Sequence, residues 1–153
     1  KGITLDQVRW AFKTARKHNF ITRGYFMIGY LDETPDTYKA TVDIARELDL
    51  DWASFSITTP LPATHLFDES VKRGYIDPDF WKKYTLLQAS KKDFPHVPSK
   101  HWDEKKLSDM MRDAYFKFYL RPGYALRRLT TIRSWKQFTD LFRGLKIIFL
   151  MKD

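Results

Sequence analysis

The spacing of apolar and polar residues predicts that helices and strands alternate along the first half of the chain. Apolar residues recur every three or four positions over 5–15 and again over 38–48, which is typical of amphipathic helices. Two apolar runs, 20–28 and 52–58, have the length of strands, and the first is apolar on both faces from Tyr25 onward. The order helix, strand, helix, strand predicts an α/β fold in which the two strands pair in parallel.

The expected helix starts carry suitable capping residues. Thr4 with Gln7 three residues later has the capping-box pattern, and Thr34 or Glu33 caps the helix that Pro35 begins. These signals fix the starts of the helices on either side of the first strand.

The second half of the chain is predicted to be mainly helical. A helix is expected over 64–73, a short helical turn over 78–84 and a longer helix over 103–121. No periodicity holds over 85–100, where two prolines favour extended or turn backbone. The last part, 124–150, predicts a short basic helix and then a second one with a capping box of its own.

A candidate site lies where the first strand gives way to the next helix. Gly29 ends the apolar run and Glu33 stands at the helix start, so both lie at the carboxyl end of a predicted parallel strand. α/β proteins bind ligands at this end of the sheet. The spacing alone leaves two interpretations open: a ligand-binding turn, or a structural turn with a glycine for backbone geometry and a glutamate favoured by a helix N-terminus.

Composition excludes several kinds of site within the chain. Its 153 residues are 43% hydrophobic, which is enough to bury a core. Cysteine is absent, which excludes disulfides, thiolate zinc sites and a cysteine-bound iron–sulfur cluster held by this chain. The four histidines fit no ligand spacing, so no metal site is expected. The sequence has no nucleophile elbow, phosphate loop or paired acid–base carboxylates, so no catalytic residue is assigned.

The excess of positive charge lies entirely in the second half of the chain. Residues 1–76 hold ten Lys+Arg and ten Asp+Glu, whereas residues 77–153 hold seventeen and nine. This shift predicts a boundary between an α/β part, 1–76, and a basic helical extension, 77–153. The start Lys1-Gly2-Ile3-Thr4 is typical of the inside of a protein, so the chain is expected to be a piece of a longer one.

The basic tail is the feature of the sequence that could support a second class of function. Between Lys117 and Asp153, nine Lys+Arg stand against two acidic residues, with aromatic residues interleaved. A solvated surface is the first interpretation of such a tail. Because its last segment is amphipathic, peripheral contact with an anionic membrane through 124–150 comes second and is favoured over nucleic acid. The apolar runs are too short to span a bilayer, so the expected location is cytoplasmic, with any membrane contact peripheral.

The stretch 24–34, Gly-Tyr-Phe-Met-Ile-Gly-Tyr-Leu-Asp-Glu-Thr, resembles the fifth-strand motif of radical S-adenosylmethionine (SAM) enzymes, especially the branch with a cobalamin-binding domain. The family pattern is Gly-x-Ile-x-Gly-x-x-x-Glu. Gly29 and Glu33 match it, Met27 takes the place of the isoleucine, and Tyr25 takes that of the first glycine.

Two further blocks extend the resemblance. Residues 53–64 are similar to the sixth strand and its Thr-Pro-x-Pro-Gly-Thr turn, with Ala63 in place of the glycine, and residues 118–124 are similar to a phrase that follows the barrel. The blocks together resemble the anaerobic magnesium-protoporphyrin monomethyl ester cyclase group. The resemblance implies that the chain forms the last βα units of a partial (βα)6 barrel, a partial TIM barrel, followed by a helical C-terminal extension.

The resemblance also implies a function for the parent protein. Such an oxidoreductase or methyltransferase cleaves SAM reductively to start radical chemistry, and this chain would supply part of the adenosyl-binding wall without being active alone. The parent would also hold a 4Fe-4S cluster and, in this branch, cobalamin, neither of them ligated by this chain. The expected cofactor-binding residues are Tyr25, Met27, Gly29, Glu33, Ile57, Thr58 and Thr59, with Glu33 in a structural role.

The expected partner is the N-terminal part of the parent chain. A two-stranded sheet has two unpaired edges and is marginal in water, so further strands must cover it, or the chain must self-associate through those edges. The alternative function is a non-enzymatic basic helical module that binds an anionic membrane surface. A CxxxCxxC stretch upstream would separate these two functions.

Overall fold

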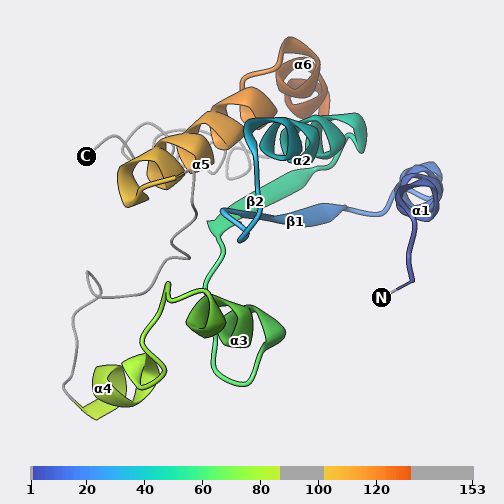
Figure 1. Ribbon diagram of the computed structural model, residues 1–153. Coiled ribbons are helices and arrows are strands. Elements are labelled where there is room, and N and C mark those ends of the chain that lie inside the picture. Colours follow the sequence, from blue (N-terminus) through green and yellow to red (C-terminus); the bar gives the residue numbers. More distant parts are fainter. Residues whose placement is uncertain (1, 87–101, 132–153) are drawn as a thin grey trace.

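A computed structural model describes residues 2–86 and 102–131 (Figure 1). The elements are, in order, α1 (Leu5–Lys17), β1 (Arg23–Ile28), α2 (Pro35–Glu47), β2 (Trp52–Ile57), α3 (His65–Lys72), α4 (Phe80–Leu86), α5 (Glu104–Tyr119) and α6 (Pro122–Thr131). The predicted alternation of helices and strands is confirmed. The second tail helix and most of the segment 85–100 lie outside the described residues.

The two strands pair in parallel along their whole length. Arg23 lies opposite Trp52 at one end and Ile28 lies opposite Ile57 at the other. Parallel strands need a crossover connection, and α2 provides it. The predicted cap Thr34 begins α2, with its side chain accepting from the amide of the third helical residue.

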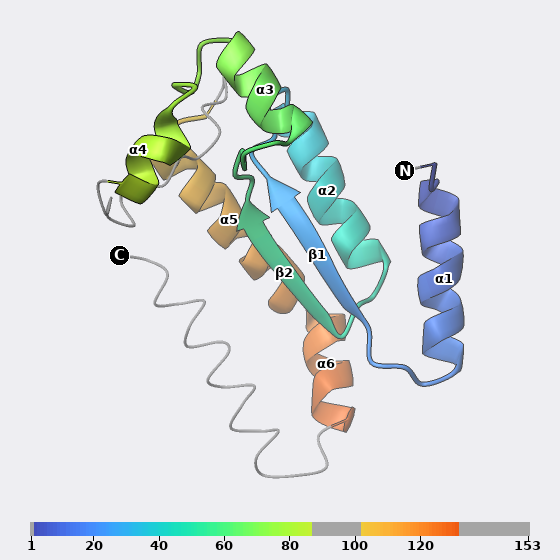
Figure 2. The ribbon, with the colours of Figure 1, turned by 90° about the horizontal axis from the view of Figure 1, so that it is seen from below.

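Two helices, α2 and α5, cover one face of the sheet. Figure 2 shows the strands in front, with these helices behind them. Side chains from both strands and both helices form one core, which includes Ile28, Tyr38, Val42, Ala45, Leu50, Phe55, Leu107, Met110, Ala114 and Phe118. The covered face therefore has the packing expected of a βα unit.

The opposite face of the sheet is not covered by any described element (Figure 2). Tyr25 is 74% exposed and Met27 is 56% exposed, although both lie in the middle of β1. Within the described part of the chain, β1 is thus apolar on both faces, as predicted, but covered on only one of them. An open apolar sheet face of this kind marks a surface that interacts with something else.

The helix that covers β2 is α5, not α3, which follows β2 directly. Leu107 and Phe118 of α5 are fully buried against the sheet, whereas Leu66 of α3 packs in a separate small cluster with Leu31 and Tyr75. One core therefore contains residues from both sides of the predicted boundary at residue 76. Whether the boundary separates two units of a longer protein stays a prediction.

Arginines hold the loop that leads into the amino end of β2. The guanidinium of Arg127 donates to the carbonyls of Asp49 and Leu50, at 3.0 and 2.8 Å, and Arg16 lies 3.1 Å from the carboxylate of Asp49. These contacts join α1 and α6 to the loop before β2. This end of the sheet is therefore built for packing and ion pairing.

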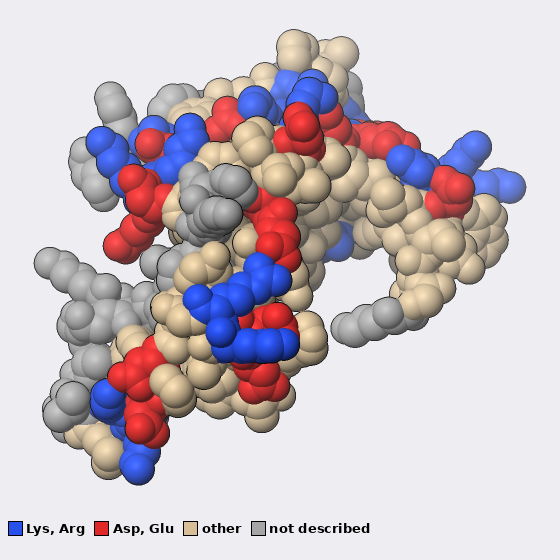
Figure 3. Space-filling model, in the orientation of Figure 1, with Lys and Arg blue, Asp and Glu red and all other residues tan. Residues whose placement is uncertain are grey.

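Charges are mixed over the described part of the molecule. Residues 2–86 and 102–131 hold 18 Lys+Arg and 16 Asp+Glu, and the face in Figure 3 shows both signs interspersed. Most of the chain's net positive charge thus lies in residues outside the described ranges. Most of the segment 124–150, for which membrane contact is predicted, also lies outside them. No helix within the described ranges has the length and apolar character to cross a membrane.

Candidate functional site at the carboxyl end of the sheet

The carboxyl ends of β1 and β2 lie side by side. The amide of Thr58 donates to the carbonyl of Ile28 at 2.7 Å, so the pairing continues one residue past the end of β2. Parallel strands bring their carboxyl ends to one edge, which is where the predicted residues from both strands were expected to meet. This edge carries the candidate site.

A tight turn leads from β1 to α2. Gly29 has φ +82°, the left-handed region that favours glycine, and its amide donates to a carboxylate oxygen of Glu33 at 2.6 Å. The amide of Glu33 in turn donates to the carbonyl of Tyr30 at 2.9 Å. The carboxylate thus holds the turn from inside.

Glu33 is buried, with 7% of its surface exposed. Burial raises the pKa of Glu33, and the hydrogen bond from Gly29 opposes that rise only in part. The carbonyl of Glu33 accepts from the indole of Trp102 at 3.1 Å, which ties the turn to the segment before α5. These contacts give Glu33 a role in holding the backbone, and its place in a cofactor site stays a prediction.

The predicted ligand-facing residues of β1 lie on the open face of the sheet. Tyr25 and Met27 are opposite Ser54 and Ser56 in the strand register. Ser56 is exposed and Ser54 half-buried, so small polar side chains adjoin the two large apolar ones. This face combines an apolar wall with hydroxyl groups, a composition that suits a flat ligand with polar edges.

The predicted residues of β2 have different surroundings. Ile57 is half-buried and packs against the core on the helix-covered side, so its side chain does not share the open face. Thr58 is fully buried, and within the described part of the chain its hydroxyl has no hydrogen-bond partner. Thr59 is half-buried. A buried hydroxyl without a partner costs free energy, and its full burial keeps this hydroxyl away from any ligand on the open face.

Helix α3 is anchored to the same turn. The guanidinium of Arg73 makes two hydrogen bonds to the carboxylate of Asp32, at 2.7 and 3.2 Å. Ala63, which stands where the resembled turn has a glycine, has φ +58° and so keeps a glycine-like backbone. Ala63 therefore adopts a backbone conformation that glycine takes more readily.

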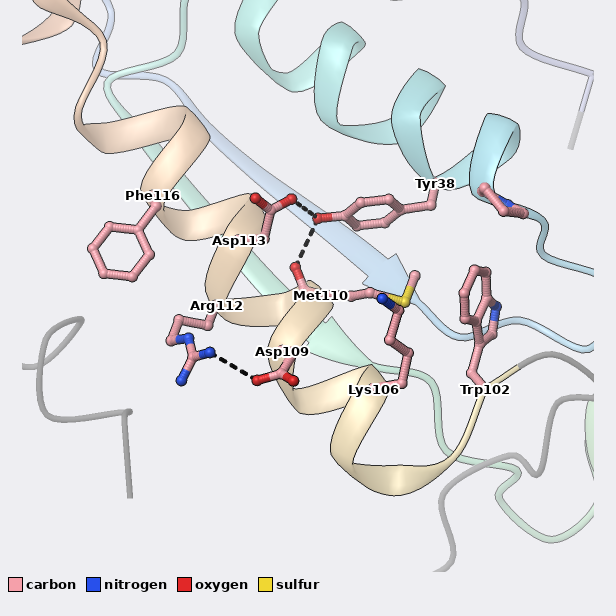
Figure 4. A pocket seen from close by; sticks show the side chains of 9 residues that line it. Tyr38, Trp102, Lys106, Asp109, Met110, Arg112, Asp113 and Phe116 are labelled. Atoms are coloured by element: carbon pink, nitrogen blue, oxygen red, sulfur yellow. Dashed lines mark hydrogen bonds and ion pairs between the residues drawn. The ribbon is translucent and has the colours of Figure 1, made fainter.

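A separate groove of about 540 Å³ lies in the helix layer, between α2 and α5 (Figure 4). Tyr38 donates there to Asp113 at 2.7 Å, and Arg112 pairs with Asp109 at 2.8 Å. Burial, and then the hydrogen bond to Asp113, raise the pKa of Tyr38. None of the predicted site residues lines this groove, and its acidic side chains are already engaged.

Among the described residues, no group of three or more His, Asp or Glu side chains could hold a metal ion. The carboxyl end of the sheet thus offers apolar surface, hydroxyls and backbone groups.

Comparison with known proteins finds relatives that are named as enzymes. It is 38% identical over 127 residues to an uncharacterized methyltransferase of Pyrococcus horikoshii, covering 83% of this chain and 26% of that protein. It is 25% identical over 124 residues to the anaerobic magnesium-protoporphyrin IX monomethyl ester cyclase of Rubrivivax gelatinosus, covering 81% and 21%. The chain is related to methyltransferases and cyclases of this kind.

A third relative is also named as a methyltransferase. The bacteriochlorophyllide d C-12(1)-methyltransferase of Chlorobaculum tepidum is 31% identical over 97 residues, covering 63% of this chain and 20% of that protein. No family model matches the chain. The predicted similarity to the magnesium-protoporphyrin cyclase group is confirmed. The chain spans about a quarter or less of the length of these relatives.

Proposed function

We propose that the chain supplies part of the SAM-binding wall of a radical SAM enzyme. In this proposal β1 and β2 are the last two strands of a partial (βα)6 barrel, and the open face of the sheet is turned to the barrel interior. The relatives support it, because methyltransferases and a cyclase are enzymes that act on organic substrates and are several times longer than this chain. The remaining strands and the cluster ligands would belong to other parts of a longer polypeptide.

One observation carries the proposal: β1 presents large apolar side chains on the uncovered face just before its carboxyl end. Tyr25 and Met27 would be poorly placed in water, because no element of the described part of the chain covers the apolar surface that they expose. Against the adenosyl group of SAM, the same side chains would form an apolar wall, and the exposed hydroxyl of Ser56, opposite Met27, would supply a polar group beside it. The residues present therefore fit the cofactor.

The chain's own residues would hold SAM in place and would take no chemical part in the reaction. The Gly29–Glu33 turn fixes the end of β1 from behind, so that the wall residue Met27 is held on a rigid strand. When bound together with a reduced iron–sulfur cluster, SAM supplies the radical chemistry of such enzymes, whether the parent is a methyltransferase or an oxidoreductase and whether or not it uses cobalamin. Since the chain has no cysteine, the ligands of the cluster would lie elsewhere in the parent, and this chain would contact only the adenosyl part of SAM.

Replacing a wall residue by a charge tests the proposal. In the parent enzyme, Met27→Asp should weaken SAM binding by about tenfold or more, because burial of one apolar side chain is worth about 1.5–3 kcal/mol. Titration calorimetry measures the affinity. Phe116→Asp, in the groove of the helix layer, is the matched control and should leave the affinity unchanged. Equal affinities for wild type and Met27→Asp would refute the adenosyl-wall proposal.

A further inference from the structure

The outer edge of β2 is the edge that faces away from β1. The amide of Trp52 donates to the carbonyl of Thr22, just before β1, at 3.1 Å, and the amide of Thr58 donates to the carbonyl of Ile28, the last residue of β1, at 2.7 Å. The backbone groups of Trp52 and Thr58 therefore face β1. Since successive residues of a strand direct their backbone groups to opposite edges, Ala53 and Phe55 direct theirs away from β1. In a two-stranded sheet, such groups are an open template for a further strand.

Two tyrosines of α5 occupy these outward-facing groups. The amide of Ala53 donates to the hydroxyl of Tyr119 at 3.1 Å, and that hydroxyl donates to the carbonyl of Ala53 at 2.8 Å. The amide of Phe55 donates to the hydroxyl of Tyr115, which donates to the carbonyl of Phe55, both at 3.1 Å. Each hydroxyl therefore satisfies both backbone groups of one strand residue, as a paired strand would.

The two tyrosines can reach the two strand residues at the same time because α5 runs antiparallel to β2 and the residue spacings of the helix and the strand are nearly equal. Residues four apart in a helix are separated by about 6 Å along its axis. Residues two apart in a parallel strand are separated by about 6.6 Å. Tyr115 and Tyr119 are four apart, and Phe55 and Ala53 are two apart in the opposite direction, so both hydroxyls reach their partners at once.

The rings that carry the hydroxyls are fixed by neighbouring aromatic side chains. The rings of Tyr115 and Tyr119 stack at 6.2 Å and 12°, and Phe55 meets Tyr115 edge-on at 5.2 Å. Tyr124 meets Tyr119 edge-on at 5.3 Å. A third strand could pair with β2 only after both rings had left these contacts.

We propose that Tyr115 and Tyr119 form a cap that ends the sheet at β2 and prevents another polypeptide strand from pairing there. The inference is independent of the proposed function, because it rests on contacts at the outer edge of β2, the edge that faces away from β1. It makes the two edges of the sheet unlike: strand pairing with another polypeptide is confined to the outer edge of β1. The partner excluded at β2 is any extended segment, including β1 or β2 of a second copy.

The double variant Tyr115→Phe/Tyr119→Phe of the full chain tests the cap, since it removes two hydroxyls and keeps both rings. Hydrogen exchange should be about tenfold faster at the amides of Ala53 and Phe55, which is the change expected from losing a hydrogen bond. Light scattering should show a larger average mass than for wild type at the same concentration. Tyr124→Phe is the matched control, because its hydroxyl donates to the carbonyl of Asp51, outside β2, at 2.9 Å.

The two single variants keep the test decisive if the double variant fails to fold. Tyr115→Phe should speed exchange at Phe55 alone, and Tyr119→Phe should speed it at Ala53 alone. Equal acceleration of both amides in either variant would overturn the proposal, because it would show general loosening of α5. Exchange rates and masses identical to those of Tyr124→Phe would overturn it as well.

Discussion

Gly29 lies where β1 leaves the sheet, and two features of its surroundings exclude a larger residue. Its φ of +82° strains any residue with a Cβ, and a Cβ built there would lie 2.7 Å from a methyl carbon of Leu107. Leu107 is fully buried and has little room to move. From the sequence, a larger residue at Gly29 would be expected to block the ligand, but the structure directs the new side chain into the core.

Gly29→Ala should therefore lower the free energy of unfolding, through backbone strain and through the clash with Leu107. Gly74→Ala is the matched variant that measures the cost of backbone strain alone. Gly74 also has a positive φ, +71°, but nothing lies within 4 Å of a Cβ there. We expect Gly74→Ala to cost about 1–2 kcal/mol from backbone strain alone. Gly29→Ala should cost about 1–3 kcal/mol more, from overpacking against Leu107. Urea denaturation measures both, and equal costs would contradict the predicted clash.

Glu33 makes stability depend on pH. Its pKa is raised by burial above the ordinary value of 4.5, so the folded state binds its proton more tightly than the unfolded state does. The stabilisation by this group is therefore complete below the unfolded pKa and is lost as pH rises through the folded pKa. Glu33→Gln cannot titrate, yet its amide oxygen can still accept from Gly29.

The measurement is the free energy of unfolding of wild type and Glu33→Gln at several pH values from 4 upward. The stability of wild type relative to the variant should fall as pH rises above about 4.5, the ordinary value for a glutamate. A constant difference between the two proteins would show that the Glu33 carboxyl titrates alike in the folded and unfolded states.

At the scale of elements, α5 is the helix that holds the sheet. Leu107 is 1% exposed in the core, so Leu107→Ala should lower the free energy of unfolding by about 2–5 kcal/mol. Leu126 in α6 is 68% exposed, and Leu126→Ala should change it by less than about 0.5 kcal/mol. Similar small costs for both would show that α5 does not pack on the sheet in solution.

Helices and caps could be predicted from the sequence because their signals are local. Thr4 and Thr34 each bond an amide three residues ahead, so the cap and its partner lie within one turn. The docking of α5 on β2 could not be predicted this way, since Tyr119 contacts a residue 66 positions earlier. In the sequence, Tyr115 fits a helical core stripe, and nothing marks a hydroxyl that bonds a strand edge.

Of the candidate site, too, only the local part could be predicted from the sequence. Gly29 and Glu33 are four residues apart, and the structure joins them by a direct hydrogen bond. The side-chain direction of Ile57 was not predictable, because the sequence does not say which face of β2 the helices cover. The unpartnered hydroxyl of Thr58 likewise depends on long-range packing and has no local signal.

For the whole molecule, the absence of cysteine predicts what the chain does alone. After anaerobic reconstitution with iron and sulfide, it should hold no iron–sulfur cluster, because thiolate ligands are missing. It should then form no 5′-deoxyadenosine from SAM. Iron analysis and an assay of that product check both points, and a stoichiometric cluster with turnover would refute the view that cluster ligands lie elsewhere.

The unequal edges of the sheet predict how the isolated chain associates. With β2 capped, the outer edge of β1 is the strand surface that another chain can use, and the open face beside it exposes Tyr25 and Met27. We expect concentration-dependent dimers through this edge. Charge repulsion would not prevent them, because it is screened over about 8 Å at physiological ionic strength.

Met27→Pro tests this route. The carbonyls of Thr22 and Ile28 accept from β2, so even-numbered residues of β1 face β2 and the amide of Met27 faces away from it. Proline there removes a donor from the outer edge without breaking the β1–β2 ladder, a position where strands tolerate proline. Light scattering across concentration should show the variant monomeric where wild type dimerises. A wild-type chain that stays monomeric, with protected β1 amides, would show that the chain covers this edge itself.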